Sequence, residues 1–225
     1  MISLLPSPST STQIGAIPSM TVNPEEVPDF VASADALLVN LGTLDPLRRE
    51  AIDAAVDVAK EAGKPWALDP VFVDRSRPRL ALAKSLADLE PTVIRCNAVE
   101  LAALAAGNGD DAAAEAFALA TLCVVARTGE VDFVTDGARS ARVSGGHPFM
   151  SQVTAMGCAA TAVLAGLLVV EPDAVVAAAA CLAFIAIAAE AAGAGAAGPG
   201  SFVPAFLDAI HALTPEDVGA RARIS

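Results

Sequence analysis

Residues 34–42 read ADALLVNLG, and this stretch decides the fold class. Its centre is a continuous apolar run, which is typical of a strand buried on both faces of a sheet, and a Gly-Thr pair at 42–43 ends it. An Ala-rich amphipathic segment follows, opened by Asp45-Pro46 and closed at Gly63. These start and stop signals predict a helix, because proline is favoured in the first helical turn and glycine at the position after the last turn.

The same alternation of strand and helix continues to residue 143. Further strands are predicted at 65–70, 91–96 and 121–127, and helices at 78–89, 98–106 and 112–119. Residues 131–135 and 138–143 flank Asp136-Gly137, which predicts an antiparallel hairpin with a two-residue loop. We therefore expect an α/β fold of three layers, in which a mostly parallel central sheet lies between two layers of helices.

The chain after Val153 is apolar, Ala-rich and predicted to be helical. Two uncharged stretches, 153–170 and 174–189, are separated by Glu171, Pro172 and Asp173. A membrane-spanning helix needs about 20 mostly apolar residues, usually with basic residues, Trp or Tyr at its ends, and both stretches lack such ends. We expect them to be core helices of a soluble protein and expect no membrane partner.

Charge and cysteine content narrow the class further. The chain has 14 Lys and Arg residues against 26 Asp and Glu residues, a net charge of −12, which argues against nucleic acid as a partner. Its four cysteines are far apart and form no Cys-x-x-Cys pair, so reduced thiols and a cytoplasmic location are expected. Residues 1–14 lack the basic and apolar regions of a signal peptide and are expected to be a disordered tail.

Polar side chains follow four successive predicted strands, at the edge where ligands bind in open α/β sheets. They are Asn40; Asp69; Arg95, Asn97 and Glu100; and Thr128. Each has an ordinary structural explanation as well: Asp69 ends a strand before a proline, Asn97 caps a helix and Thr128 begins a turn. Four such sets at one edge favour a ligand site.

The residue types at this edge suit phosphate and magnesium. Asp69 and Glu100 are carboxylates that could hold a magnesium ion through water. Arg95 could bind phosphate oxygens with its guanidinium, and the alternative is an ion pair with Glu100 or Glu130.

A fifth element, Val153–Gly166, begins with small residues and continues as an apolar helix. Its first N–H groups, from about Ala155 to Cys158, would face an anion. The helix dipole there is expected to lower the pKa of the Cys158 thiol, although a nearby phosphate would oppose this shift. A buried, inert thiol is the alternative.

Seven segments share their order with a known family: IPSMTVNPEEV (17–27), ADALLVNLGTL (34–44), LDPV (68–71), VIRCNAVE (93–100), RTGEVDFVTDG (127–137), GHPFMSQVTAMGC (146–158) and AGPGSF (197–202). Through them the chain resembles the hydroxyethylthiazole kinase family, thiamine-salvage enzymes with a ribokinase-like fold. The resemblance covers about residues 15–213 and implies one kinase domain there, followed by a C-terminal tail at 214–225.

The resemblance implies transfer of the ATP γ-phosphoryl group to the primary hydroxyl of 4-methyl-5-(2-hydroxyethyl)thiazole. It implies ATP contacts from Arg95 and Thr128, with Asn97 on the same side, and a Mg²⁺ site organised by Asp69 and Glu100. The substrate side would comprise Met20 against the thiazole, an anion hole formed by the backbone of Ala155 to Gly157, and Cys158 as a candidate general base. Family members form homotrimers with active sites between subunits, so the same assembly is expected.

Three departures from the family pattern bear on activity. Its string VTGTGC reads VTAMGC here, which places alanine at 155, a residue that accepts positive φ poorly. LDPV is followed by FVDRSRPR instead of a Gly/Ala-rich stretch. A family strand and helix before Gly15, part of the substrate pocket, are replaced by MISLLPSPSTSTQI, which would expose a sheet edge. Two alternatives stay open: a kinase of another small alcohol such as hydroxymethylpyrimidine, and a non-catalytic trimeric ligand-binding protein.

Overall fold

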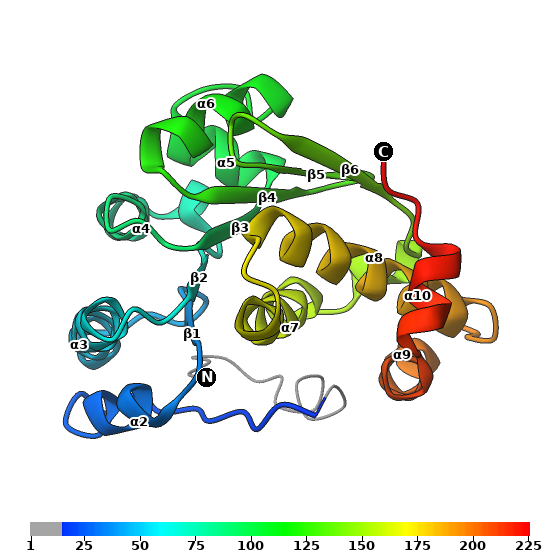
Figure 1. The fold of residues 1–225 in the computed structure, drawn as a ribbon, viewed down its shortest axis with the longest axis horizontal. Helices are drawn as coiled ribbons and strands as arrows, with labels where there is room; N and C mark the ends of the chain where they lie inside the picture. The colour runs from blue at the N-terminus through cyan, green and yellow to red at the C-terminus, as the bar shows by residue number, and fades with distance from the viewer. Residues whose placement is uncertain (1–14) are drawn as a thin grey trace.

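The computed structural model describes residues 15–225 and has a six-stranded sheet between two layers of helices (Figure 1). The strands lie side by side in chain order: β1 (Leu37–Asn40), β2 (Trp66–Asp69), β3 (Val93–Asn97), β4 (Val124–Thr128), β5 (Val131–Thr135) and β6 (Ser140–Ser144). β1 to β4 pair in parallel. β5 lies between β4 and β6 and pairs antiparallel with both. The predicted α/β fold with a mostly parallel sheet is confirmed, whereas the N-terminal tail predicted at 1–14 lies outside the described residues.

The helices between the parallel strands cover one face of the sheet. They are α3 (Pro46–Glu61), α4 (Arg77–Ala87), α5 (Ala98–Ala105) and α6 (Asp111–Thr121), with α2 (Val27–Ser33) packed beside α3. Strands that follow one another in order with right-handed crossovers place all their connecting helices on the same face. Ile52 and Val56 of α3 and Leu101 of α5 are buried there, in one apolar cluster with Leu37 and Ile94 of the sheet.

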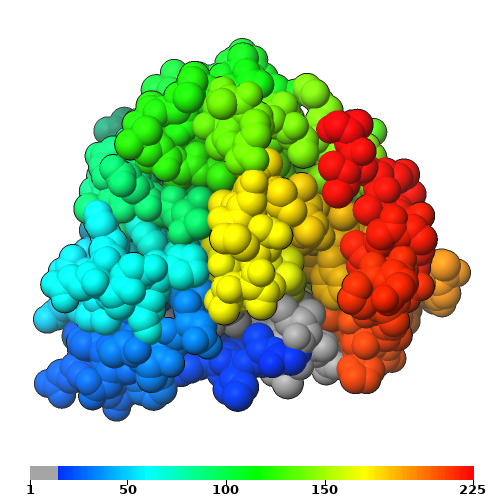
Figure 2. Space-filling view, viewed as in Figure 1, coloured from blue at the N-terminus to red at the C-terminus, as the bar shows by residue number. Residues whose placement is uncertain are grey.

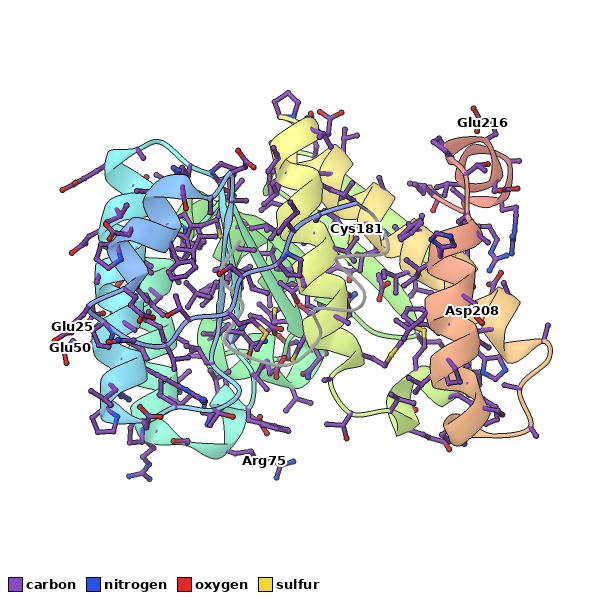
Figure 3. All side chains as sticks on the ribbon, turned by 90° about the horizontal axis from the view of Figure 1, so that it is seen from below. Glu25, Glu50, Arg75, Cys181, Asp208 and Glu216 are labelled. Atoms are coloured by element: carbon purple, nitrogen blue, oxygen red, sulfur yellow. The ribbon has the colours of Figure 1, made fainter. Side chains whose placement is uncertain are left out.

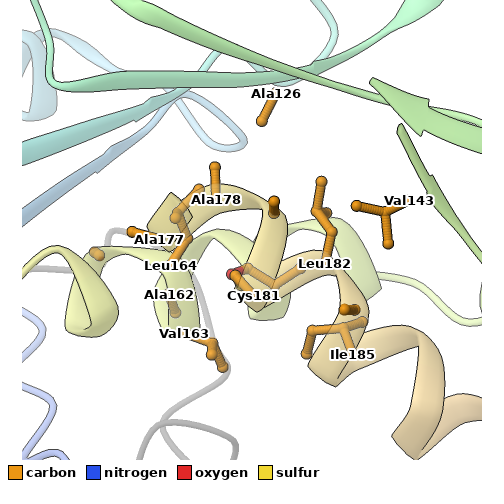
Figure 4. Close-up of a cluster of buried hydrophobic side chains, with 14 of the residues drawn as sticks. Ala126, Val143, Ala162, Val163, Leu164, Ala177, Ala178, Cys181, Leu182 and Ile185 are labelled. Carbon is orange, nitrogen blue, oxygen red and sulfur yellow. The ribbon is translucent and has the colours of Figure 1, made fainter. Parts of the chain in front are cut away.

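The apolar C-terminal helices cover the opposite face. α7 (Met156–Val170) packs on β1 and β2, α8 (Ala174–Gly193) packs on β4 to β6, and α9 (Pro199–Ala212) packs on α8. Leu164, Cys181 and Leu182 are buried with Ala126 and Val143 of the sheet (Figure 4). Cys181 is buried, whereas charged side chains such as Glu50 and Asp208 are exposed; all three are labelled in Figure 3.

α8 is, within residues 15–225, the one helix long and apolar enough by composition to cross a membrane. In this structure, 67% of its most apolar window is buried inside the molecule. A helix that is apolar on all sides fits a central layer that contacts protein on several faces. This packing accounts for the composition that we noted in the sequence.

Residues 214–225 belong to the folded body, in place of the tail that we predicted. α10 (Pro215–Arg221) follows α9, and Ile224 then pairs antiparallel with Val143 of β6. The C-terminal residues, red in Figure 2, therefore lie against the edge of the sheet. They cover an edge strand whose backbone groups would otherwise be open to pairing with another chain.

Two local predictions are wrong by a few residues. The strand predicted from Thr121 begins at Val124, because Thr121 still belongs to α6 and Leu122 takes the left-handed conformation, with a φ of 54°, that ends this helix. The β5–β6 loop has four residues, Asp136 to Arg139, instead of two. The Asp136 carboxylate accepts the N–H groups of Ala138 and Arg139 at 2.9 and 2.7 Å, which stabilises this longer turn.

Candidate active site

The carboxyl ends of β1 to β4 bring the predicted polar residues to one edge of the sheet. The register aligns Asn40 with Asp69, and Asn97 with Thr128. Arg95 lies on β3, two residues before Asn97. The four polar sets that the sequence places after separate strands therefore meet at one rim, as expected for a parallel sheet.

Asp69 is the centre of the site and is only 1% exposed. Its Oδ2 accepts hydrogen bonds from Asn40 Nδ2 at 2.8 Å and from Thr161 Oγ1 at 3.1 Å. The Gly42 N–H donates to Asn40 Oδ1 at 2.8 Å, which orients the amide so that its nitrogen faces Asp69. Within the described residues, Asp69 Oδ1 has no hydrogen-bond partner, and it lies 3.9 Å from Arg95 Nη1.

The protonation of Asp69 is governed mainly by burial. Burial raises the pKa of its carboxyl group from 3.8 to about 6, and the Arg95 charge opposes this rise. The negative charge of Glu100 adds to it. The carboxylate is thus ionised at neutral pH, in an environment that disfavours its charge and therefore favours a cation nearby.

Arg95 joins three parts of the rim. Its Nη2 donates to Thr128 Oγ1 at 2.9 Å, and its Nη1 faces Asp69. The guanidinium lies against Gly157, where an added Cβ would come within 2.3 Å of Nη1. A side chain at position 157 would therefore displace the guanidinium from this place. The ion pairs that we considered with Glu100 or Glu130 are replaced by the one with Asp69.

The start of α7 is open to an anion. Ala155 occupies its N-cap position with a φ of 69° and provides no side-chain cap. The first N–H groups of a helix have no partner within it, so the backbone around Met156 and Gly157 offers free donors with a local positive potential. The positive φ that we anticipated at Ala155 is present.

Replacing Ala155 with glycine is expected to stabilise the protein by about 1 kcal/mol, because alanine in the left-handed region is strained by roughly that amount. The free energy of unfolding in urea, measured for both chains, tests this. Ala116→Gly is the matched control, since Ala116 lies exposed inside α6 and glycine should destabilise an ordinary helix. A loss of stability in both variants would contradict the strain at Ala155.

The pKa prediction for Cys158 is wrong. Burial, followed by the adjacent Asp69 charge, raises the pKa of this thiol to about 11 instead of lowering it. The thiol keeps its proton at neutral pH, and Asp69 and Asn40 are among the groups that affect its pKa. The other three cysteines are buried, as expected of inert thiols, and the pKa of each is raised by burial: Cys96, Cys123 and Cys181.

Asn97 and Glu100 form a capping box at the start of α5. Asn97 Oδ1 accepts the Glu100 N–H at 2.9 Å, and Glu100 Oε2 accepts the Asn97 N–H at 2.9 Å. Glu100 Oε1 accepts the N–H of Phe72 at 3.0 Å. The helix-capping explanation of Asn97 is therefore confirmed, and Glu100 also fixes the chain after β2.

The donor set fits a magnesium ion that keeps most of its water. Asp69 Oδ1 is a buried oxygen without a hydrogen-bond partner, and each Glu100 oxygen retains a second lone pair. Between residues 15 and 225 there is no group of three His, Cys, Asp or Glu side chains that could enclose a metal. Magnesium is commonly held by one or two carboxylates together with water and substrate phosphates, which is the arrangement these residues could provide.

The FVDRSRPR segment forms the chain that follows β2 and leads into α4. Arg79, at the end of this segment, donates to the carbonyl groups of Gly42 at 3.1 Å and Val71 at 2.8 Å. This arginine therefore ties together the chain that leaves β1 and the chain that leaves β2. Phe72 remains 60% exposed at this edge, in a left-handed conformation with a φ of 59°.

A cavity of about 640 Å³ opens beside Arg95 and Thr128. Its walls are the β4–β5 turn, the glycine-rich loop after β6, the 3-10 helix η2 (Pro148–Gln152), the start of α7 and one face of α8. This volume is in the range of small-molecule and cofactor sites. The cavity is continuous with the Arg95 side of the rim.

Several residues of this site were not predicted from the sequence. His147, Met150 and Ile185 line the cavity. Thr161 was also not predicted. A buried threonine hydroxyl inside an apolar helix needs a hydrogen-bond partner, and this requirement could have pointed to Thr161 as a residue of the site. Met20, expected at the thiazole, is 46% exposed and lines neither this cavity nor the apolar groove beside α7 and α10.

Solved structures place the fold in a class. An adenosine kinase from Sinorhizobium meliloti matches with a TM-score of 0.58 and 21% identity, over 88% of this chain and 57% of that one. This likeness concerns the ribokinase-like fold alone.

Closer relatives identify the family. The sequence pattern of the hydroxyethylthiazole kinase family matches residues 9–216. A hydroxyethylthiazole kinase from Cereibacter sphaeroides is 46% identical over 93% of this chain and 85% of its own, and a probable one from Agrobacterium fabrum is 44% identical over 95% and 81%. The structure of such a protein from Pyrococcus horikoshii has a TM-score of 0.92 and 30% identity, over 97% and 87%. The chain belongs to the hydroxyethylthiazole kinase family, a family of phosphotransferases for which ATP is the implied donor.

Proposed function

We propose that this protein transfers the γ-phosphoryl group of ATP to the primary hydroxyl of 4-methyl-5-(2-hydroxyethyl)thiazole, with Mg²⁺, in thiamine biosynthesis. The observation that carries the proposal is the position of Arg95. Its guanidinium contacts Thr128, faces Asp69 and lies over Gly157 at the free start of α7, beside a cavity of about 640 Å³. The names of the similar proteins support the choice of substrate.

The rim residues divide the phosphates between two sides. Arg95 and Thr128 would bind ATP oxygens from the cavity, with Asn97 beside them, and the backbone of Ala155 to Gly157 would receive the transferred group. Magnesium would be held by Asp69 and, through water, by Glu100, and would neutralise phosphate charge. These groups suit phosphoryl transfer, which depends mainly on positioning and on stabilising charge spread over the phosphoryl oxygens.

In the reaction the substrate hydroxyl oxygen forms a bond to the γ-phosphorus while the bond to the β–γ bridging oxygen breaks and ADP leaves. Cys158 would contact the hydroxyl from the first turn of α7. With a pKa near 11 the thiol is a poor general base at neutral pH, so we assign it to hydrogen bonding and orientation of the alcohol. A loose transition state needs little removal of the proton before the new bond forms, and the hydroxyl proton then passes to a phosphate oxygen or to water.

Replacing Cys158 with alanine is expected to lower kcat about tenfold, the equivalent of one hydrogen bond made in the transition state. The side chain is only partly buried, so the variant should keep its fold. Steady-state kinetics and circular dichroism of the same preparation measure both effects. Wild-type turnover in Cys158→Ala would show that the thiol only packs, and Cys181→Ala, in the core of α8, provides a control for packing loss alone.

The substrate is tested by offering hydroxyethylthiazole and hydroxymethylpyrimidine in parallel with ATP and Mg²⁺, and measuring the phosphorylated products. We expect the thiazole phosphate. Phosphorylation of the pyrimidine alone would refute the proposed substrate. ATP binding without turnover of either alcohol would instead favour the non-catalytic interpretation.

We further propose a homotrimer with active sites between subunits, and a cytoplasmic location. The half-exposed Met20, away from the cavity of its own chain, supports a contact across subunits. The four free cysteines suit a reducing compartment. Sedimentation equilibrium should give about three times the chain mass of 22.6 kDa.

A further inference from the structure

The loop after β6 forms one wall of the cavity beside Arg95 and contains two glycines, which have no side chains to pack. Gly145, Gly146 and His147 line the cavity. The two glycines have φ values of 136° and 99°, in a region that other residues adopt with strain. Because glycine has no side chain to anchor it, the position of this wall depends on what other parts of the chain hold against it.

Glu190, near the end of α8, provides one such contact. Its Oε1 accepts the N–H of Gly146 at 3.2 Å. The following residue, His147, packs its ring against Gly193, where an added Cβ would come within 2.2 Å, and stacks on Phe202 at 5.8 Å. The carboxylate and the imidazole thus attach the wall to α8 and α9.

Arg223, in the C-terminal segment, holds the same carboxylate. Its guanidinium forms an ion pair with Glu190 Oε1, the oxygen that accepts the Gly146 N–H. A Cβ at Gly145 would come within 2.7 Å of Arg223 Nη2, so glycine permits this close approach. The backbone of Arg223 is fixed in turn, because its carbonyl accepts the N–H of Ser144 at 3.0 Å.

Without Arg223, Glu190 would be a partly exposed carboxylate attached to a mobile side chain, free to turn toward water. With it, the carboxylate is held between the sheet edge and the loop. The family match covers residues 9–216, so Glu190 lies inside the part of the chain that the family pattern describes and Arg223 lies outside it.

We propose that Arg223 is a positioning residue for nucleotide binding: it orients Glu190, which holds the Gly145–His147 wall of the cavity. The inference rests on the proposed function in one respect, that this cavity binds ATP. It assigns to the C-terminal segment a part in the affinity for the nucleotide and none in the thiazole side of the site.

The test is a comparison of Arg223→Ala with Arg223→Lys and Arg221→Ala. We expect Arg223→Ala to raise the KM for ATP about three- to fivefold, the scale of a partly exposed ion pair with its hydrogen bond. The KM for thiazole and kcat should change less than twofold. Arg223→Lys should restore most of the ATP affinity, and Arg221→Ala, which removes the same charge from exposed α10, should resemble the wild type.

A direct binding measurement separates this inference from the proposed function. Calorimetric titration with a non-hydrolysable ATP analogue should show binding to the wild type and a weaker Kd for Arg223→Ala. Absence of binding to the wild type would overturn the proposed function itself. Binding that is equal in wild type and Arg223→Ala, or weakened as much by Arg221→Ala, would overturn the role of Arg223 alone.

Discussion

Replacing Arg95 with alanine is expected to lower kcat/KM for ATP by a factor of about 10² to 10⁴. In the proposed site the guanidinium would make two charge-assisted hydrogen bonds to phosphate, each worth roughly 1.5–3 kcal/mol. A tenfold change in rate corresponds to about 1.4 kcal/mol. The loss should be larger for ATP than for thiazole, because Arg95 contacts Thr128 on the cavity side. Steady-state kinetics with each substrate varied in turn measures the difference.

A second variant separates the charge of Arg95 from its position. Gly157→Ala keeps the arginine but adds a Cβ that would lie 2.3 Å from Arg95 Nη1, so the guanidinium must move. It should weaken ATP in the same direction as Arg95→Ala, while Arg75→Ala, which removes an exposed arginine paired with Asp74, should not. Equal weakening of ATP and thiazole by Arg95→Ala would contradict the side assigned to this residue.

Replacing Asp69 with asparagine should abolish most activity while improving stability at neutral pH. The amide keeps the shape of the side chain but removes the charge expected to hold magnesium, and a loss of about 10²-fold or more in kcat corresponds to one strong electrostatic contact. Kinetics at saturating ATP and several magnesium concentrations test the first half. Unfolding in urea between pH 4 and pH 7 tests the second.

The sign of the stability effect follows from the raised pKa. Asp69 has a pKa of about 6 in the folded chain against 3.8 as its ordinary value, with Arg95, Glu100 and Cys158 as its charged or titratable neighbours. Its protonated form therefore stabilises the fold below about pH 4, and this contribution is lost as the pH rises through 6. Asparagine does not titrate, so the stability of Asp69→Asn relative to the wild type should rise with pH by about 3 kcal/mol at most.

Two outcomes would contradict this account of Asp69. A relative stability that falls with pH would mean that the carboxylate charge stabilises the fold, with Arg95 outweighing burial. Full activity in Asp69→Asn would remove the residue from the magnesium site. Asp45→Asn is a control for both measurements, since Asp45 is an exposed helix cap whose amide can still accept the Arg48 N–H.

Much of the fold could be predicted because its signals are local. The apolar run at 37–41, the Asp45-Pro46 start and Gly63 after the end of α3 are read from neighbouring residues, and the structure has all three. Asn97 and Glu100 are three positions apart and form their capping box within one helical turn. The boundary errors at Thr121 and Asp136 arose where one left-handed residue or one Asx turn decided the end of an element.

The residues that make up the site could be predicted from the sequence for a different reason. Parallel strands begin and end at common edges, so residues that follow separate strands, such as Asn40, Asp69 and Thr128, must share a rim once the sheet is known. The contacts among these residues could not be predicted from the sequence. The guanidinium of Arg95 pairs with Asp69 and not with Glu100. The strand register and the approach of α7, whose Gly157 lies against the guanidinium, determine where Arg95 points.

The amino-acid pattern alone specifies strands, helices, an acidic surface and the residue types that meet at the rim, because hydrophobic period and turn chemistry act over a few positions. The tertiary structure decides the rest: the proton kept by Cys158, the partner of Thr161, and the contact of Arg223 with Glu190. These depend on burial and on the field of groups distant in the chain. Solvation and Coulomb energies are set by separation in space, which local sequence does not encode.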